Sequence, residues 1–492
     1  MMKKILTSAE SRQFDNHIIE SRKIPGIILM EQAASGLAYV VSERFSANCN
    51  VAVLCGSGNN GGDGYACSRI LLSKGFKIRC IDLSGKKLPP DAETMRDIII
   101  SYENVYYRAD SSETLKQLLI GADVIIDAIF GTGLSRAPGG FYNDVIEIVN
   151  SSGIPVVSAD VPSGVFADSG VFVNAVKADI TVAFQHLKPA HVIYPACSMC
   201  GETITVSIAA EDDFIDSEYF FVDELRLPKR KRNSNKGNYG RLGILAGSTG
   251  MAGAAVLAAS ASVAAGSGLT RVFCPSTVLQ AVQKNVVEAT AYISGTDHLE
   301  AGMLDFEVLR ASTAIAAGPG LGKDSSVRDI VLDIIGLDVP KVLDADALNS
   351  LQGSDLEKAV NTVITPHPKE FSRLFNVELS DVLADPVSYA RKFAAQYGIV
   401  ILLKGASTVV TDGNTTYITN TGTPAMAKGG SGDVLTGVTG SFLAQGMETI
   451  KAAYYAAYFC GRAGELAAAD SSEYSASALD TVKNLGKAFA QA

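Results

Sequence analysis

Short apolar runs alternate with helical patterns along most of this 492-residue chain. In the first half these runs lie at Val51–Cys55, Lys77–Asp82, Val124–Ile129, Val156–Asp160 and Ile180–Phe184. In the second half they lie at Leu242–Ala246, Thr270–Cys274, Ala314–Ala317, Lys341–Asp344, Val363–Thr365 and Ile399–Lys404, followed by a hairpin of Ser407–Thr411 and Thr416–Thr419. Repeated strand–helix alternation predicts parallel sheets with helices on both faces, so the expected fold class is α/β.

The alternation is interrupted by a charged stretch after residue 211. Its second half is expected to be extended or irregular, and we interpret Lys229–Arg232 as part of a solvated linker. We place a domain boundary near 212–235. The prediction is two α/β domains, one over residues 1–212 and one over residues 225–492.

The composition narrows the class of protein. A net charge of −10 argues against nonspecific binding to nucleic acid. The stretch Met251–Leu269 is mostly Ala, Ser and Gly, so we expect a tightly packed buried helix and not a membrane span. With no apolar stretch of signal-peptide length at the start, we expect a cytoplasmic protein, and we also expect a homo-oligomer. Cys197 and Cys200 have C-x-x-C spacing without a second pair, which favours reduced thiols over a redox or metal role.

A glycine-rich turn follows the first strong strand. Gly56–Gly61 matches G-x-G-x-x-G, precedes an expected helix at Tyr65–Ser73, and has Asp82 about 20 residues on. This arrangement is typical of a Rossmann-like dinucleotide site, in which glycines let the backbone approach a pyrophosphate. A purely structural turn is the alternative. No Gly-Lys-Ser/Thr follows, so the turn is not a Walker A loop.

Polar groups cluster at several predicted strand ends. Asn59, Asn60 and Asp63 supply amides and a carboxylate that a simple phosphate cradle does not need, and they could bind a cation, a sugar or a nicotinamide. Asp127 ends the strand before a second glycine loop, Gly131–Ala137, and Asp160 ends another strand close to Ser163. Ligands of open parallel sheets bind at the carboxyl ends of strands, so these groups are expected to share one crevice. Isolated aspartates at strand ends also act as helix caps.

The strongest local pattern is Thr423–Gly437, in which Lys428-Gly429-Gly430-Ser431-Gly432 leads into a helix with Asp433 in its first turn. The N–H groups of Gly429 to Gly432 are expected to hold a transferring phosphoryl group. Asp433 is placed to accept a proton from an attacking hydroxyl. A plain helix N-cap is the alternative role for this aspartate.

The motifs NNGGDG, DAIFGTGL and DVPSG, in this order, resemble the epimerase domain of the bifunctional NAD(P)H-hydrate repair enzymes over about residues 1–212. The resemblance implies epimerisation at the hydroxyl-bearing C6 of hydrated NADH or NADPH, with Asp160 as a catalytic residue. It implies that the hydrate is held by Asn59, Asn60, Gly61, Gly62, Asp63, Gly131, Thr132, Gly133, Leu134, Ser135, Arg136, Ala137 and Asp160. It also implies a potassium ion on Asn60, Asp127 and Ser163. Ala34 stands where a glycine is common in the family.

The second half resembles the ribokinase-like, nucleotide-dependent NAD(P)H-hydrate dehydratase over about residues 225–490. Gly318-Pro-Gly-Leu-Gly322, Asp344-Ala-Asp-Ala-Leu348 and Thr365-Pro-His-Pro-Lys-Glu370 carry this resemblance together with the glycine turn. It implies a hydrate site of Ala254, Gly320, Gly322, His367 and the catalytic Asp433. It implies a nucleotide site of Lys404, Gly405, Ala406, Ser407, Thr408, Lys428, Gly429, Gly430, Ser431 and Gly432. ADP is the expected co-substrate, with Mg²⁺ on the nucleotide.

Two other functions are compatible with these patterns. The second half could be a kinase of a small hydroxylated metabolite, which would release a stable phosphorylated product. The first half could be a non-enzymatic nucleotide-binding scaffold, which would bind the hydrate without interconverting its epimers. The preferred interpretation is an enzyme that equilibrates the R and S hydrates and dehydrates the S form, giving AMP and phosphate.

Overall fold

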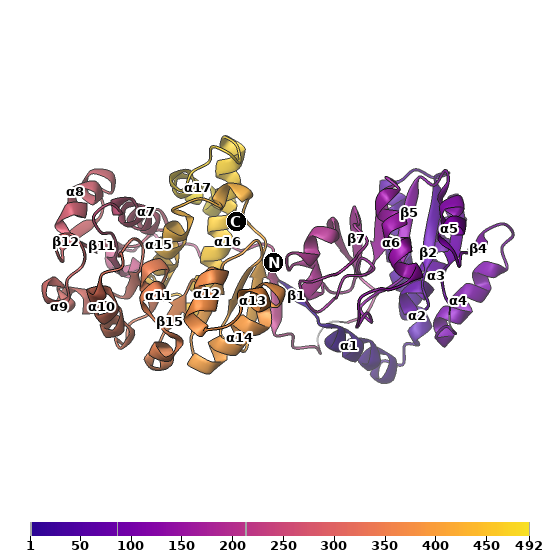
Figure 1. Ribbon diagram of the computed structural model, residues 1–492, viewed down its shortest axis with the longest axis horizontal. Helices are drawn as coiled ribbons and strands as arrows, with labels where there is room; N and C mark the ends of the chain where they lie inside the picture. The colour runs from indigo at the N-terminus through magenta and orange to yellow at the C-terminus, as the bar shows by residue number, and fades with distance from the viewer. Residues whose placement is uncertain (1, 86, 212–213, 492) are drawn as a thin grey trace. The chain divides into compact units, whose positions relative to one another are not determined.

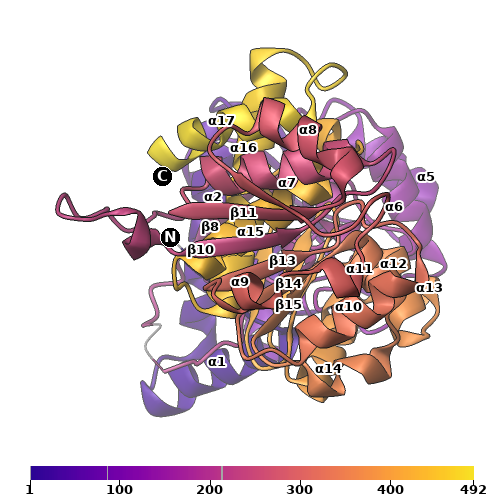
Figure 2. The ribbon, with the colours of Figure 1, turned by 90° about the vertical axis from the view of Figure 1, so that its left-hand side faces the viewer.

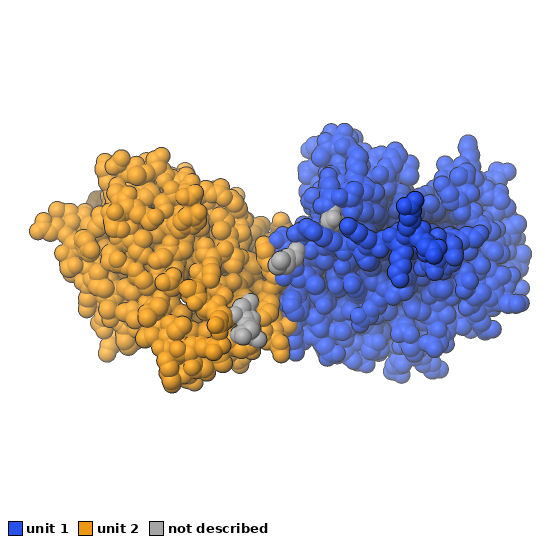
Figure 3. All heavy atoms as spheres, turned by 180° about the vertical axis from the view of Figure 1, so that it is seen from behind, with its two compact units in different colours: residues 1–2, 218–492 blue, residues 3–217 orange. Residues whose placement is uncertain are grey.

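A computed structural model describes residues 2–85, 87–211 and 214–491 of the chain. The chain divides into two compact units, shown in orange and blue in Figure 3. The N-terminal unit is Lys3–Ser217, and the C-terminal unit is Glu218–Ala492 together with Met1–Met2. Each unit contains its own sheet (Figure 1).

The N-terminal unit is built on a seven-stranded sheet whose paired strands all run parallel. The spatial order is β4-β3-β2-β5-β6-β7-β8. The strands are β2 (Asn50–Cys55), β3 (Lys77–Asp82), β4 (Tyr106–Arg108), β5 (Val124–Ala128), β6 (Val156–Ala159), β7 (Ile180–Phe184) and β8 (Glu202–Val206). This is the Rossmann order, in which chain direction across the sheet reverses between β2 and β5.

Both faces of this sheet are buried. Val53 belongs to a core with Leu37 and Tyr65, while its neighbour Leu54 belongs to a core with Leu115 and Val145. Because successive strand residues point to opposite faces, helices must cover both sides, as the run of apolar residues predicts. The helices are α1 (Ser8–Ser21), α2 (Gly26–Arg44), α3 (Asn59–Ser73), α4 (Pro90–Ile100), α5 (Ser112–Leu119) and α6 (Phe141–Ser151).

The sheet of the C-terminal unit has the strand order β9-β18-β17-β16-β15-β14-β13-β10-β11-β12. Its strands are β9 (Tyr219–Val222), β10 (Arg241–Leu245), β11 (Leu269–Cys274), β12 (Thr290–Ile293), β13 (Ala314–Ala317), β14 (Lys341–Leu343), β15 (Thr362–Ile364), β16 (Val400–Leu403), β17 (Thr408–Thr411) and β18 (Thr416–Thr419). Strand β1 is Met2–Ile5. From β12 to β16 all pairs are parallel, and the β16–β17–β18 pairs are antiparallel. The parallel part repeats the strand order of the N-terminal sheet, with its switch point between β10 and β13.

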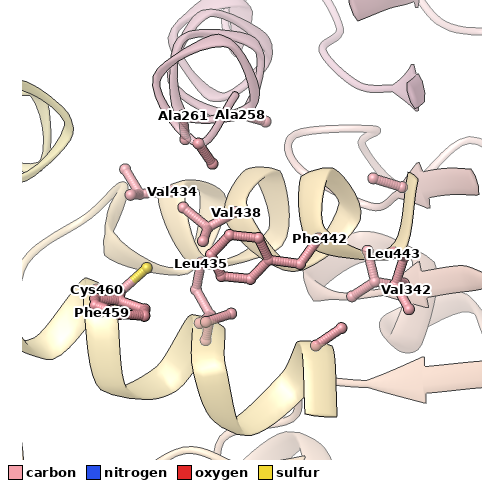
Figure 4. Packing of buried hydrophobic residues seen from close by; sticks show 14 of the residues in the cluster. Ala258, Ala261, Val342, Val434, Leu435, Val438, Phe442, Leu443, Phe459 and Cys460 are labelled. Atoms are coloured by element: carbon pink, nitrogen blue, oxygen red, sulfur yellow. The ribbon is translucent and has the colours of Figure 1, made fainter. Parts of the chain in front are cut away.

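Helices cover both faces of this sheet as well (Figure 2). One face carries α7 (Ala252–Ala264), α8 (Ser276–Asn285), α15 (Ser431–Ala444), α16 (Thr449–Asp470) and α17 (Ala478–Ala490), whose apolar side chains form a single core. Figure 4 shows part of this core, with Val438 and Phe442 of α15 between Ala258 and Ala261 of α7 and Phe459 of α16. The remaining helices are α9 (Phe306–Arg310), α10 (Ser325–Ile335), α11 (Ala345–Ser350), α12 (Pro368–Phe375), α13 (Leu379–Ala384) and α14 (Pro386–Tyr397).

The α/β class expected from the sequence is confirmed, and Met251–Leu269 contains a packed helix, α7, as expected. Two local expectations were wrong. Helix α3 begins at Asn59, so the segment expected to be a loop before Tyr65 is the first turn of that helix. The charged stretch expected to be a linker contains β9, which pairs with β18. Residues 212 and 213, at the expected boundary, lie outside the described residues. None of the helices in the described residues is long and apolar enough to cross a membrane.

Candidate functional sites

A cleft of about 750 Å³ opens at the carboxyl ends of β2, β5, β6 and β7 in the N-terminal unit. This is the edge at which a Rossmann-like sheet binds its ligand. Most of the residues predicted from the sequence line it, namely Asn59, Asn60, Asp63, Gly131, Thr132, Gly133, Leu134, Ser135, Arg136 and Asp160. Gly61, Gly62 and Ala137 do not belong to this lining.

The glycines before and in α3 allow close packing of the backbone. A Cβ on Gly56 would lie 1.9 Å from the Ile129 carbonyl oxygen, and one on Gly61 would lie 2.1 Å from the Gly56 carbonyl oxygen. A Cβ on Gly62 would meet the Met30 side chain at 2.6 Å. The motif therefore brings the start of α3 against the loop after β5, which places the helix N-terminus at the cleft.

The cleft holds a buried ion pair that the sequence motifs did not reveal. Lys188 Nζ donates to Asp160 Oδ1 at 2.5 Å, and the Lys188 side chain is only 4% exposed. Asp160 adopts φ +62°, an uncommon conformation for a residue other than glycine, which is frequent at functional sites. The pair links the end of β6 to the segment after β7.

Asp63 is the second carboxyl of the cleft. Burial raises its pKa well above the ordinary value, and the negative charges of Asp160 and Asp15 raise it further, against the opposing charge of Lys188. Asp15, on α1, also lines the cleft, and burial is the main cause that raises its pKa to about 6. The site therefore combines an ion-paired carboxylate with a second carboxyl that holds its proton more tightly than usual, which is the combination that acid–base catalysis needs.

His191 contacts the backbone of both members of the ion pair. Its Nδ1 accepts a hydrogen bond from the Lys188 backbone N–H at 3.0 Å, and its Nε2 lies 2.7 Å from the Asp160 carbonyl oxygen. Burial and the Lys188 charge lower the pKa of His191 to about 4. The ring is therefore neutral at pH 7, and its Nε2–H donates to the Asp160 carbonyl.

Of the three residues expected to hold potassium, Asp127 and Ser163 are bonded to each other, and Asn60 lies against Gly131 in the loop after β5. Ser163 Oγ donates to Asp127 Oδ1 at 2.5 Å, and a Cβ on Gly131 would lie 3.3 Å from the Asn60 side chain. Asn60 is buried, and neither of its side-chain amide atoms has a hydrogen-bond partner. Burial raises the pKa of Asp127, against its hydrogen bonds with Ser163 and Ser158. The buried amide of Asn60, which has no hydrogen-bond partner, and the oxygen-bearing side chains of Asp127 and Ser163 fit a monovalent cation with oxygen ligands.

The C-terminal unit has its candidate site at the corresponding sheet edge. Gly430 precedes α15 with φ +99°, a conformation that favours glycine, and Asp433 lies in the first turn of the helix. The first N–H groups of a helix have no partners within it, so the turn from Gly429 to Gly432 can hold an anion. Burial raises the pKa of Asp433 to about 6, with a further contribution from Asp344 that Lys404 opposes.

Lys404 is the centre of a charged network at this edge. Its Nζ donates to Asp344 Oδ1 at 2.7 Å and lies 3.8 Å from Glu370 Oε2. Thr436 Oγ1 of α15 donates to Asp344 Oδ2 at 2.9 Å. Glu370 also accepts from the His367 backbone N–H at 2.9 Å, while the His367 ring caps α12. The network joins the ends of β14, β15 and β16 to the helix that carries Asp433.

Some of the residues expected to hold the hydrate lie close to one another. A Cβ on Gly320 would come within 2.9 Å of the Ala254 side chain, and the Gly322 N–H donates to Asp346 Oδ2 at 2.9 Å. Gly405, Ala406 and Ser407 lie in the turn between β16 and β17, and Thr408 is the first residue of β17. Among the charged residues, Asp344, Asp346 and Glu370 were not assigned to the site from the sequence. Lys428, expected to bind the nucleotide, donates from its Nζ to the Tyr474 and Ala476 carbonyl oxygens at 2.6 and 2.8 Å.

Fold and sites together define a two-domain α/β enzyme with a ligand site at the switch point of each sheet. The family described as YjeF-related protein N-terminus matches residues 26–190, and the NAD(P)H-hydrate dehydratase family matches residues 242–485. The bifunctional NAD(P)H-hydrate repair enzyme Nnr of Moorella thermoacetica is 34% identical over 94% of this chain and 92% of its own. Nnr of Escherichia coli is 33% identical over 85% and 80%. The chain belongs to the bifunctional NAD(P)H-hydrate repair enzyme family, with epimerase and dehydratase activities, as its motifs implied.

A solved relative is also similar to the C-terminal unit. The ADP/ATP-dependent NAD(P)H-hydrate dehydratase from Bacillus subtilis, co-crystallized with ATP/Mg²⁺, is 31% identical to this chain. It covers 54% of this chain and 94% of its own, with a TM-score of 0.48.

Proposed function

We propose that the N-terminal unit interconverts the R and S hydrates of NADH and NADPH, and that the C-terminal unit dehydrates the S form at the expense of ADP. The observation that supports the first half is the buried Lys188–Asp160 pair beside the neutral Asp63 in one cleft. The observation that supports the second is Asp433 at the glycine-rich start of α15, next to Lys404.

For epimerisation, the nitrogen lone pair of the ring expels the C6 hydroxyl as water when an acid donates a proton to it. Asp63 is that acid in our proposal, because burial keeps its carboxyl protonated. Water then adds to the other face of the iminium carbon and loses its proton to Asp160, whose carboxylate is held by Lys188. Transfer of that proton to Asp63 restores the starting state.

For dehydration, the oxygen of the C6 hydroxyl attacks the terminal phosphorus of ADP while Asp433 accepts the proton of that hydroxyl. The bond between the two phosphoryl groups breaks and AMP leaves. The phosphorylated oxygen is then expelled as phosphate by the ring nitrogen, and loss of a C5 proton gives NAD(P)H. Lys404 is placed to balance the negative charge near Asp344 and Asp433.

Two ions complete the proposal. Asn60, Asp127 and Ser163 would hold potassium, which supplies a fixed positive charge at the cleft. Mg²⁺ would accompany the nucleotide and neutralise its phosphates.

We also propose a homo-oligomer in the cytoplasm, which light scattering and cell fractionation would test.

The central experiment uses purified protein and a mixture of R and S hydrates. With ADP, absorbance of reduced nicotinamide should recover completely, and AMP and free phosphate should form in equal amounts. Without ADP, the two epimers should interconvert while absorbance stays constant. A stable phosphorylated product in place of free phosphate would instead support a metabolite kinase, and hydrate binding without interconversion would support a scaffold.

A further inference from the structure

The loop between α16 and α17, residues 471–477, packs against the glycine turn before α15. Thr423 Oγ1 lies 3.0 Å from Glu473 Oε1, and Lys428 Nζ donates to the Tyr474 carbonyl oxygen at 2.6 Å. A Cβ on Gly430 would lie 3.0 Å from the Ala478 side chain, at the start of α17. Two of these contacts lie within the loop and one lies just after it, so its backbone is held beside the proposed phosphate site.

Internal hydrogen bonds also fix the loop. The Ala476 N–H donates to the Ser472 carbonyl oxygen at 3.0 Å, and the Ser472 and Ser475 hydroxyls lie 2.8 Å apart. Ser477 and Asp480 then form a capping box at the start of α17. These bonds give the loop a defined backbone position.

The side chain that this loop presents is the ring of Tyr474. The residue is 96% exposed, the highest fraction among the large apolar and aromatic side chains of the described residues. Single exposed aromatic residues are common on proteins, so exposure alone assigns nothing. What distinguishes Tyr474 is that its own carbonyl is bonded to Lys428, the residue immediately before Gly429 of the glycine turn.

We propose that Tyr474 stacks on the base of the bound nucleoside diphosphate, and that Lys428 is a positioning residue that holds the loop in place. The proposal rests on the proposed function of the C-terminal unit as a nucleotide-dependent dehydratase. In this proposal the glycine turn binds the phosphates and the base projects away from it, toward the loop whose Tyr474 carbonyl is bonded to Lys428 and whose Tyr474 ring is uncovered. Stacking on an aromatic ring tolerates any base, because every base has a π-face.

Lys428 was expected from the sequence to bind the nucleotide itself. Its ammonium group has three donors, and two carbonyl oxygens of the loop accept from it. The lysine therefore acts through the loop that it fixes. Its positive charge also lies beside the proposed phosphate site, so Lys428 can affect ADP binding both by attracting the phosphates and by holding the loop. Fluorescence from a residue at position 474 reports on the loop and separates these two roles.

The chain contains no tryptophan, which makes Tyr474→Trp a direct test. The variant has one indole fluorophore, at the proposed stacking position. Titration with ADP and Mg²⁺ should quench its emission saturably, with the same dissociation constant that calorimetry gives. Val287→Trp is the matched control, because Val287 is 78% exposed in the same unit and lies between α8 and β12. Its emission should not respond.

Affinity gives the second measurement. Tyr474→Ala should weaken ADP binding about 5- to 150-fold, the range for loss of one aromatic–base stack, whereas Tyr474→Phe should stay within about twofold. The loss should fall on the KM for ADP. In a Tyr474→Trp background, Lys428→Met should reduce the amplitude of quenching at saturating ADP.

The outcomes separate the two proposals. If the unaltered protein does not bind ADP in calorimetry, the proposed function of the C-terminal unit fails. If it binds ADP, but the indole is not quenched and Tyr474→Ala binds as tightly, only the stacking proposal is overturned.

Discussion

Replacement of Asp433 by asparagine separates the catalytic requirement for this carboxyl from its effect on stability. The substitution Asp433→Asn keeps the shape of the side chain but cannot accept a proton. General-base catalysis contributes about 10²–10⁴-fold, so ADP-dependent dehydration should fall by that factor. Epimerisation, which we assign to the other unit, should keep its rate.

The same substitution should raise stability at neutral pH. The carboxyl has a pKa of about 6 in the folded chain against an ordinary value of 3.8. At about 1.4 kcal/mol per pH unit, this corresponds to roughly 3 kcal/mol against the ionised form. Because the side chain is only partly buried, about 1–2 kcal/mol is a better expectation. Asparagine removes this penalty.

Proton linkage determines how the free energy of unfolding changes with pH. A carboxyl whose folded pKa is raised binds more protons in the folded state between pH 3.8 and 6, so the free energy of unfolding decreases as pH rises through that window. The stabilisation by Asp433→Asn should therefore be absent near pH 4 and complete above pH 6. Wild-type dehydration should fall about tenfold per pH unit below pH 6, as its base becomes protonated.

Calorimetry of the full chain at pH 4 and pH 7.5, with turnover measured on the same samples, tests these statements. Asp123→Asn is the matched control, because hydrogen bonds from Asn50 lower the pKa of Asp123, which precedes β5 in the other unit. That variant should lose stability and keep turnover. An Asp433→Asn protein with turnover within tenfold of wild type, or with lower stability at pH 7.5, would refute the reasoning.

Three further changes test the other parts of the structure. Lys188→Met leaves the Asp160 carboxylate buried without its partner, so epimer interconversion should fall at least 100-fold while dehydration of pure S hydrate continues; equal rates of interconversion would contradict the role of the pair. Asn60→Ala removes the unpartnered amide, so any rise of the epimerisation rate with potassium should disappear, as a salt titration against sodium would show. Fragments 3–217 and 218–492 should each fold and retain one activity, whereas a C-terminal fragment that starts at 223 should be less stable because it lacks β9, as thermal melts would measure.

The sequence predicted the parallel strands well because their residues are buried on both faces. It failed at the start of α3, where three glycines between Gly61 and Gly64 disfavour a helix by propensity. Tertiary packing overrides that preference, because a Cβ on Gly61 would collide with the Gly56 carbonyl oxygen. It also failed at β9, where charged neighbours hide a short strand that pairs with β18 at Tyr219–Thr416.

Some site residues missed from the sequence stand in no local motif, and others stand in motifs that do not show which charges meet. Lys188 is one of 42 lysines and arginines, and nothing near it in the sequence points to Asp160. Only the parallel pairing of β6 with β7 places the segments after these strands together. Glu370 and Thr436 meet Lys404 and Asp344 for the same reason, since they follow β15 or belong to α15. Motifs therefore predict the glycine turns and the aspartates near them, while strand order brings other charged residues, such as Lys188 and Glu370, to the same sites.

The two units use one strand order for two chemical problems. The N-terminal cleft lies where the sheet order reverses, after β2 and β5, and the C-terminal candidate site extends from the corresponding point, after β10 and β13, to the ends of β14, β15 and β16. Epimerisation returns the hydroxyl that it removes, so an acid and a base suffice, and the N-terminal cleft offers Asp63, Asp160 and Lys188. Dehydration must eliminate that hydroxyl without returning it. Because hydroxide is a poor leaving group, the hydroxyl must first be activated. The C-terminal site therefore adds what the first site does not need, a glycine-rich helix start that can hold a phosphoryl donor beside Asp433.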